Sequence, residues 1–95
     1  MNKKVKYNRD KYLQCTYGIT LKEYKALLKA QRYKCAICSK KQKDCKQHLD
    51  VDHSHKTGKV RGLLCRYCNS RLLKYLRDDK KRAKGLVKYL NKYYV

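Results

Sequence analysis

Four of the six cysteines form two Cys-x-x-Cys pairs, Cys35 with Cys38 and Cys65 with Cys68, and residues 39–64 lie between the pairs. Two residues between the sulfurs let one turn present both thiolates to one ion, and a second such turn completes a tetrahedron suited to Zn²⁺. Because four thiolates leave no position for water, the spacing predicts a structural zinc site. Two redox pairs, or reduced cysteines in a core, are the alternative interpretation. The other two cysteines lack such partners and are expected to be free thiols: Cys15 and Cys45.

Groups able to hydrolyse a phosphodiester lie close to these cysteines in the sequence. Asp52 and His53 fall between the two pairs, and Asn69 directly follows the last cysteine. Hydrolysis needs a nucleophilic water, a base for its proton and positive charge near the phosphate. An imidazole titrates near neutral pH, so His53 is a candidate base. Asp52 and the side-chain oxygen of Asn69 are candidate ligands for a hard divalent ion.

Each of these residues also has a structural interpretation. Asp52 could be a solvated strand residue, His53 could pack against its neighbours, and Asn69 could bond backbone groups beside the cysteines. Strict alternation along a strand would place Asp52 and His53 on opposite faces, so both reach one phosphate only if the strand ends or bends there. Three nearby cations are candidate phosphate contacts, although a basic composition also explains them: Lys59, Arg61 and Arg66.

The charge balance indicates a polyanionic partner. The chain has 27 Lys and Arg against 7 Asp and Glu, a formal net charge of +20. Nucleic acid is the usual polyanion that neutralises such a surface, whereas a membrane surface is disfavoured because the cations do not form one amphipathic face. No apolar run is long enough to span a bilayer, and no apolar stretch follows the basic N-terminus, so neither a membrane segment nor a secretory signal is expected.

The apolar composition predicts a small core. The chain has ten Tyr but no Phe and no Trp. A chain of this length buries only a marginal hydrophobic core, and a structural metal commonly compensates for that. We therefore expect the chain without zinc to be largely unfolded.

Capping and periodicity predict the elements that position these groups. A capping box at Thr20 and Glu23 opens a helix over about residues 21–31, and a short helix is expected near residues 8–15. Alternation over residues 48–53 and 59–64, around a turn at 54–58, predicts a β-hairpin. A helix follows the second cysteine pair, and an amphipathic helix closes the chain, its apolar face formed by Ala83, Leu86, Val87, Leu90 and Tyr94.

Four segments in order resemble the phage recombination endonuclease VII family, whose members are HNH-type nucleases of the ββα-metal fold. The segments are CAIC, LDVDHSH, TGKVRGLLC and CRYCN. The stretch from Tyr17 to Cys38 is similar to the helix that precedes the first cysteine pair in that family. The resemblance covers about residues 17–76.

The resemblance implies roles for particular residues. Zinc would be held by Cys35, Cys38, Cys65 and Cys68, and a catalytic Mg²⁺ or Mn²⁺ by Asp52 and Asn69. His53 would be the general base, and His55 would contact or position the phosphate. It implies cleavage of DNA to 5′-phosphate and 3′-hydroxyl ends, in the cytoplasm of a bacterial host if a phage encodes the chain.

We therefore expect a small α+β, zinc-stapled ββα-metal (HNH) hairpin-helix core with flanking helices, and one domain over residues 1–95. Residues 1–18 would be a basic N-terminal arm and 79–95 a C-terminal helix. The expected function is a DNA endonuclease that nicks or cuts with one divalent ion. A four-way junction resolvase acting as a dimer, and a non-catalytic zinc module that binds nucleic acid, are the alternatives. The last helix would pair two subunits or pack on its own hairpin, and the second is favoured.

Overall fold

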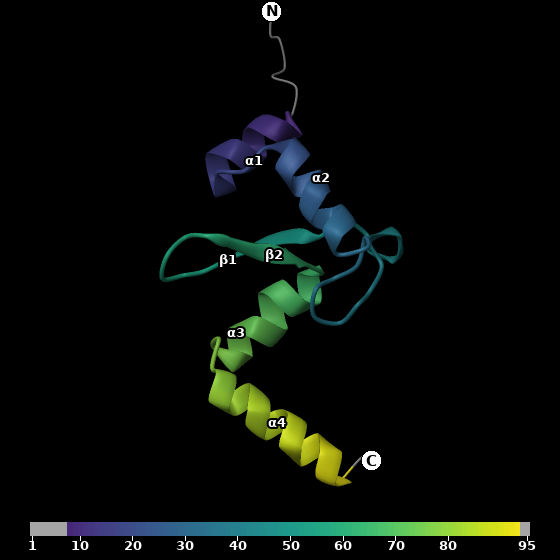
Figure 1. Cartoon of the computed structure of the whole chain (residues 1–95), viewed down its shortest axis with the longest axis vertical. Helices are drawn as coiled ribbons and strands as arrows, with labels where there is room; N and C mark the ends of the chain where they lie inside the picture. The colour runs from purple at the N-terminus through teal and green to yellow at the C-terminus, as the bar shows by residue number, and fades with distance from the viewer. Residues whose placement is uncertain (1–7, 94–95) are drawn as a thin grey trace, which may run out of the picture.

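The computed structural model describes residues 8–93 and contains one β-hairpin flanked by helices. Helices α1 and α2 lie on one side of the hairpin, and the helical segment η2–α3 lies on the other (Figure 1). The small α+β fold predicted from the sequence is thus confirmed. The elements in chain order are α1 (Arg9–Tyr17), α2 (Leu21–Ala30), the 3₁₀ turn η1 (Gln42–Asp44), β1 (Asp50–His53), β2 (Val60–Leu64), the π-helical turn η2 (Cys68–Leu72), α3 (Leu73–Leu76) and α4 (Lys80–Tyr93).

The two N-terminal helices are joined by caps that the sequence specifies. Gly18 ends α1 in the left-handed region, with a φ of 75°. The predicted capping box at the start of α2 is present, because Thr20 and Glu23 each accept a hydrogen bond from the other's backbone N–H. Asp10 of α1 accepts from the backbone N–H of Leu21 at 2.7 Å. Three backbone donors near the start of α2 are therefore satisfied, and α1 is tied to α2. The first part of the predicted N-terminal arm, residues 1–7, lies outside the described residues.

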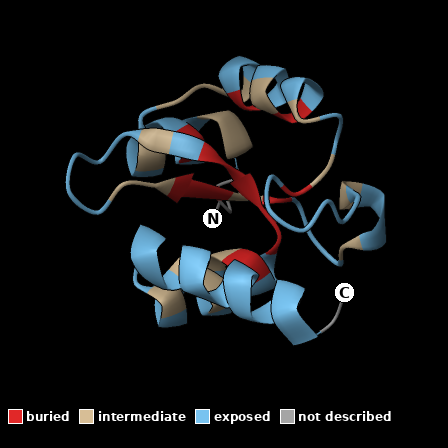
Figure 2. Ribbon diagram, turned by 60° about the horizontal axis from the view of Figure 1, so that its bottom comes forward, coloured by how far each residue is buried: buried red, intermediate tan, exposed pale blue. Residues whose placement is uncertain are grey.

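The hairpin forms the floor of the core. β1 and β2 pair antiparallel, and Val51 opposes Leu63 with exposed fractions of 4% and 0%. Tyr24 of α2 is buried in the same cluster, and its hydroxyl donates to the carbonyl of Leu49 at 2.6 Å. Figure 2 shows the buried residues concentrated on the strands and on the helix faces turned toward them. The cluster consists of Leu13, Tyr24, Leu28, Leu49, Val51, Leu63 and Leu64, together with Cys35, Cys65 and Cys68.

A glutamine side chain extends the sheet on the open edge of β2. Gln31, at the end of α2, accepts from the backbone N–H of Leu63 and donates to its carbonyl, both at 2.9 Å. It also donates to the carbonyl of Lys34 at 2.8 Å. The amide therefore pairs with β2 as a neighbouring strand would. Gly62 permits this approach, because a Cβ there would lie 3.2 Å from the Gln31 side-chain oxygen.

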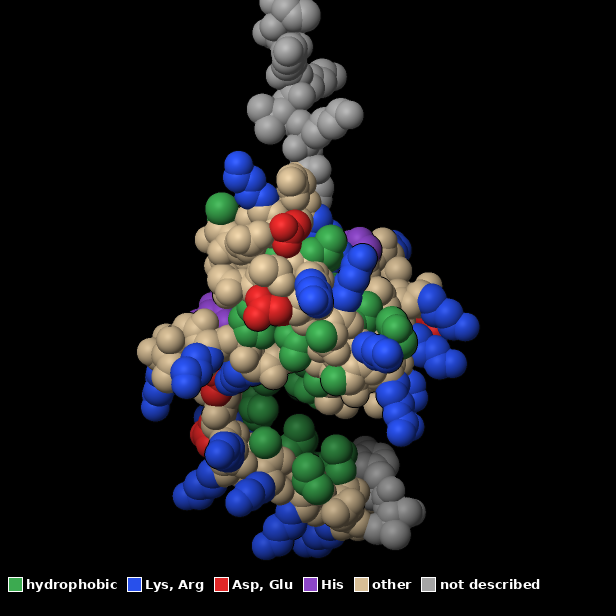
Figure 3. Space-filling model, turned by 45° about the horizontal axis from the view of Figure 1, so that its top comes forward, with side chains coloured by type: hydrophobic (Ala, Val, Ile, Leu, Met, Phe, Trp, Pro, Cys, Tyr) green, Lys and Arg blue, Asp and Glu red, His purple; other side chains and the backbone are tan. Residues whose placement is uncertain are grey.

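Helix α4 stands away from the rest of the described chain (Figure 1). Asp79 caps it by accepting a hydrogen bond from the backbone N–H of Arg82 at 3.1 Å. Its apolar side chains gather on the side that faces the body across an open gap (Figure 3), and Leu86, Val87 and Leu90 are 47%, 57% and 43% exposed. The expectation that this helix packs on its own hairpin is therefore wrong. Tyr94 lies outside the described residues.

None of the helices in residues 8–93 has the length and apolar content needed to cross a bilayer.

Candidate functional site

The four paired cysteines meet at one point, although they come from two segments. Their sulfurs all lie within 4.8 Å of one another, and Cys38 and Cys65, one from each pair, are 3.7 Å apart. Four sulfurs at Zn–S distances of about 2.3 Å form a tetrahedron with edges of about 3.8 Å. The cluster therefore fits a zinc ion in both donor type and size. The predicted free thiols, Cys15 and Cys45, lie outside this cluster.

Backbone amides directed at its sulfur favour the thiolate of Cys35, whereas the pKa values of Cys38 and Cys68 are raised. Burial of Cys35 opposes ionisation, but the backbone N–H groups of Cys38, Cys65 and Ile37 outweigh it and lower the pKa of Cys35 to about 7. Burial raises the pKa of Cys68, and the neighbouring thiols raise it further. The thiolate of Cys35 is therefore populated near neutral pH, and this is the form in which a cysteine binds a metal ion.

A bulge in the hairpin bends the strands at Asp52 and His53. Asp52 pairs with Gly62, whereas the next residue, His53, pairs with Val60, so Arg61 is an extra residue in β2. A bulge increases local twist and redirects side chains. The strand pairing is therefore irregular at the position where strict alternation would place Asp52 and His53 on opposite faces.

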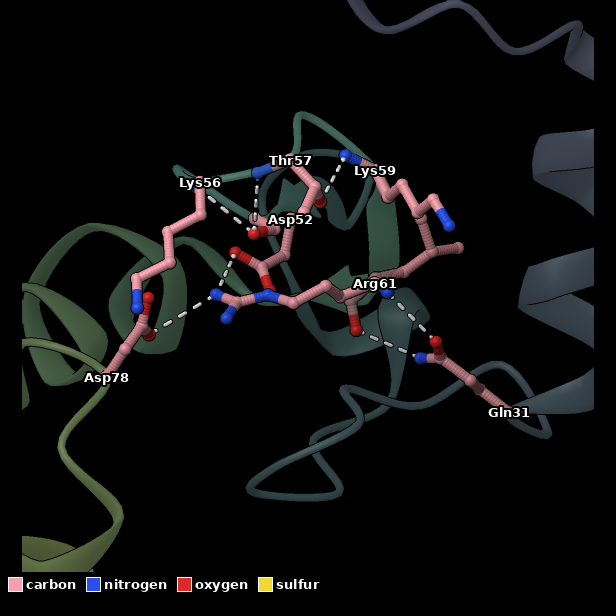
Figure 4. Close-up of polar contacts among 9 residues, drawn as sticks. Gln31, Asp52, Lys56, Thr57, Lys59, Arg61 and Asp78 are labelled. Carbon is pink, nitrogen blue, oxygen red and sulfur yellow. Dashed lines mark hydrogen bonds and ion pairs between the residues drawn. The ribbon is translucent and has the colours of Figure 1, made fainter.

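The extra residue directs its guanidinium onto the Asp52 carboxylate (Figure 4). Arg61 donates from Nε to Oδ2 at 2.7 Å and from Nη2 to Oδ1 at 3.1 Å, and Nη2 also lies 3.3 Å from the carboxylate of Asp78. Hydrogen bonds to Asp52 raise the pKa of Arg61 further above its usual range. Asp52 is only 9% exposed, so it is a buried, paired carboxylate and not a solvated strand residue.

Asp52 and Asn69 line one open groove between the hairpin and the helices that follow it. We call it the hairpin groove, and its volume is about 950 Å³. Its wall includes His55, the two carboxylates of Asp52 and Asp78, and five cationic side chains: Lys56, Arg61, Lys74, Arg77 and Lys80. The surplus of cations makes the groove suitable for a phosphate group.

Asn69 lies in the π-helical turn η2, directly after the cysteine cluster. Its amide nitrogen lies 3.5 Å from a carboxylate oxygen of Asp50, which Arg66 also contacts at 2.9 Å. Donation by that nitrogen leaves the amide oxygen of Asn69 available as a ligand. Asp52 and Asn69 therefore offer the oxygen donors that a hard divalent cation prefers.

His53 lies beside this groove and contacts aromatic rings. Its ring centroid is 6.1 Å from that of Tyr17 and 5.2 Å from that of His55. Among the described residues that line the hairpin groove, His55 is present and His53 is not. The structure therefore brings Asp52, Asn69 and His55 to one groove and leaves the predicted base, His53, outside its lining.

The predicted phosphate contacts are spread over three environments. Arg61 lines the hairpin groove but is paired with Asp52, and Arg66 is paired with Asp50 in a neighbouring pocket. Lys59 is exposed and lies outside the groove lining.

Sequence reasoning missed several residues of the site. No motif in the sequence marks Asp78 or Asp50 as part of the site. The lysines and arginine contributed by residues 74–80 carried no signal, because cations are common throughout this chain. Only the folded connection between α3 and α4 brings them to the groove.

Comparison with known proteins finds one matching family model and similar proteins from two phages. A family model described as recombination endonuclease VII matches residues 10–92. The Gene 59 protein of Mycobacterium phage D29 is 46% identical over 77 residues, which cover 81% of this chain and 46% of that protein. The Gene 59 protein of Mycobacterium phage L5 is 45% identical over 75 residues, which cover 79% of this chain and 45% of that protein. The chain thus spans about half the length of the curated relatives it matches.

Proposed function

Because the chain belongs to the recombination endonuclease VII family, we propose that it is a zinc-stapled DNA endonuclease that uses one divalent ion. The hairpin, its bulge and the following helical segment act as a ββα-metal, HNH-type core. The observation that supports this most is the hairpin groove, in which Asp52 and Asn69 lie together among five cationic side chains.

The cysteine cluster has a structural role in this proposal. Zinc on Cys35, Cys38, Cys65 and Cys68 joins the segment before the hairpin to the turn that holds Asn69. The ion fixes the helical segment against the strands, and this fixes Asn69 relative to Asp52.

The groove, together with His53 outside its lining, would supply the remaining groups for phosphodiester hydrolysis. Asp52 and Asn69 would hold Mg²⁺ or Mn²⁺, which would supply positive charge near the leaving 3′ oxygen. His53 takes the proton of the attacking water. His55 orients the imidazole of His53 and contacts the phosphate. The products carry 5′-phosphate and 3′-hydroxyl ends.

Cations outside the chemical centre bind the DNA backbone without reading its sequence. Lys59, Arg61 and Arg66 act there with the lysines and arginine of the groove wall. A formal net charge of +20 supports this electrostatic binding.

The test is cleavage of supercoiled plasmid with Mg²⁺ by zinc-loaded wild type and by His53→Ala. Loss of the base lowers general-base catalysis by about 10²–10⁴-fold, so open-circle and linear products fall accordingly, while zinc content and DNA affinity stay the same. His48→Ala is the matched control, because His48 is exposed and lies outside the groove lining. Equal loss of binding and cleavage in His53→Ala would contradict the assignment. A wild type that binds DNA and cuts neither plasmid nor a four-way junction would instead identify a binding module.

The exposed face of α4 favours a second candidate, a junction resolvase that acts as a dimer. Leu86, Val87 and Leu90 form an apolar stripe that the described body leaves uncovered. Pairing of two such stripes would place two sites on opposing strands of a four-way junction. Sedimentation of wild type, Leu90→Gln and the control Lys81→Gln tests this. A dimer lost only in Leu90→Gln supports the candidate, and a wild-type monomer excludes it.

A further inference from the structure

The carboxylate assigned to the divalent ion already has a cationic partner. Arg61 binds both oxygens of Asp52, at 2.7 and 3.1 Å, in a two-pronged geometry. The Asp52 side chain is 12% exposed and that of Arg61 37% exposed. A carboxylate with so little contact with water is costly without a counter-charge, so this pairing stabilises the chain before any divalent ion binds.

Arg61 also has a second acid within reach. One of its terminal nitrogens lies 3.3 Å from the Asp78 carboxylate, whose side chain is 38% exposed (Figure 4). Arg77 and Asp78 both have a φ of 55°, a left-handed conformation that non-glycine residues rarely adopt. This turn between α3 and α4 places Asp78 on the groove wall. The guanidinium therefore bridges two carboxylates and can shift toward either one.

We propose that Arg61 is a displaceable counter-ion, which leaves Asp52 for Asp78 when a divalent cation takes the Asp52 carboxylate. The inference rests on the proposed function, because it takes Asp52 as the metal-binding carboxylate. Asp78 is then a positioning residue, which receives the guanidinium and keeps it on the groove wall.

Charge repulsion provides the reason for the exchange. A guanidinium stays protonated in proteins, so Arg61 cannot make room for a second cation by losing its proton. Two cations on one carboxylate repel each other strongly where water is largely excluded. Movement to Asp78 separates them without leaving either charge unpaired. After the exchange, Arg61 remains in the groove with donors directed toward a bound phosphate.

Binding of Mn²⁺ to the zinc-loaded full chain, followed without DNA by the electron paramagnetic resonance signal of free Mn²⁺, tests the proposal. Arg61→Gln is expected to bind Mn²⁺ about five- to tenfold more tightly, since binding no longer breaks an ion pair. Asp78→Asn is expected to bind it about threefold more weakly, because the displaced guanidinium has lost its second partner. Arg71→Gln removes an exposed cation that lies outside the groove lining, and it controls for net charge.

The double variant separates exchange from simple charge attraction. If Asp78 acts by receiving Arg61, Asp78→Asn has no effect in the Arg61→Gln background. An equal effect of Asp78→Asn in both backgrounds, or an Arg61→Gln affinity no higher than that of Arg71→Gln, overturns the proposal. Should Arg61→Gln fail to fold, Arg61→Lys replaces it, because an ammonium cannot bind both oxygens as a guanidinium does. An Mn²⁺ affinity of Arg61→Lys no higher than that of Arg71→Gln then overturns the proposal.

Asp52→Asn distinguishes failure of the exchange from failure of the proposed function. Loss of Mn²⁺ binding in Asp52→Asn, with no effect at Arg61, refutes only the exchange. Unchanged Mn²⁺ binding in Asp52→Asn refutes the assignment of the metal site to Asp52, and the proposed exchange is refuted with it.

Discussion

Tyr24 is among the largest fully buried side chains of the described core, and it carries a polar group. Its hydroxyl donates to the Leu49 carbonyl at 2.6 Å, immediately before β1. The ring of Tyr24 also lies 4.3 Å beneath the guanidinium of Arg9. One residue thus joins α1, α2 and the entrance to the hairpin.

Removal of this hydroxyl tests how much the contact stabilises the fold. Tyr24→Phe keeps the ring but leaves the Leu49 carbonyl without this donor, so we expect the free energy of unfolding to fall by about 1–2 kcal/mol. Denaturant unfolding of the zinc-loaded chain measures it. Tyr33→Phe, at a side chain that is 54% exposed, is the control and should change stability by less than about 0.5 kcal/mol. Equal effects of the two substitutions would show that the buried bond contributes nothing.

Among the elements, β2 depends on a side chain for part of its hydrogen bonding. Gln31 satisfies the N–H and the carbonyl of Leu63, which is 0% exposed. We expect Gln31→Ala to lower the free energy of unfolding by about 1–3 kcal/mol, because it leaves a buried backbone donor unpaired. Lys29→Ala, at an exposed position of the same helix, is the control. Amide hydrogen exchange at Leu63 measures the local effect, and unchanged protection there would contradict it.

The elements predicted correctly from the sequence are those with strong local signals. The capping box at Thr20 and Glu23 fixed the start of α2, and alternation around the Thr57-Gly58 turn located the hairpin. The spacing of the cysteines predicted a cluster that the fold brings together. The capping box, the turn and each Cys-x-x-Cys pair involve neighbours within a few residues, so they can be detected without the tertiary structure. The meeting of the two pairs was inferred from the four ligands that a structural zinc takes.

The features that could not be predicted arise from contacts between distant segments. The bulge at Arg61 and the pairing of Gln31 with Leu63 each join residues that no local pattern connects. The exposure of α4 was also missed, because an amphipathic helix looks the same in sequence whether its apolar face is covered or open. The metal and base roles of Asp52, His53 and Asn69 remain predictions, now with a groove in which to test them.

For the molecule as a whole, the small core leads us to expect that folding depends on zinc at the cysteine cluster. Three of its four thiols belong to the buried cluster itself. Zinc binding contributes on the order of 10 kcal/mol in small zinc-binding peptides, so its removal should unfold the chain. The loss of the far-UV circular dichroism signal on addition of a strong chelator measures this.

The same cluster predicts a dependence on pH. The pKa of Cys35 is depressed to about 7, so its thiolate contributes fully above the ordinary thiol pKa and is lost as the pH falls through about 7. Protons then compete with zinc, and we expect zinc release and loss of helix signal to occur together on acidification. A metal indicator measures the zinc release, and circular dichroism measures the helix signal. Cys15→Ser should leave the pH midpoint of zinc release unchanged. A chain that keeps its helix signal after zinc release would refute the prediction.

The bulge in the hairpin also determines where this chain can change length. Residues 55–58 of the turn are exposed, so an inserted residue there lengthens a loop and leaves both strands in register. Deletion of Arg61 would make the pairing regular and remove the counter-charge of Asp52. A residue inserted between Gly62 and Leu63 would turn Leu63 toward the opposite face and shift the second cysteine pair relative to the first. Related sequences should therefore vary in length at the turn and keep a constant spacing from Arg61 to Cys65.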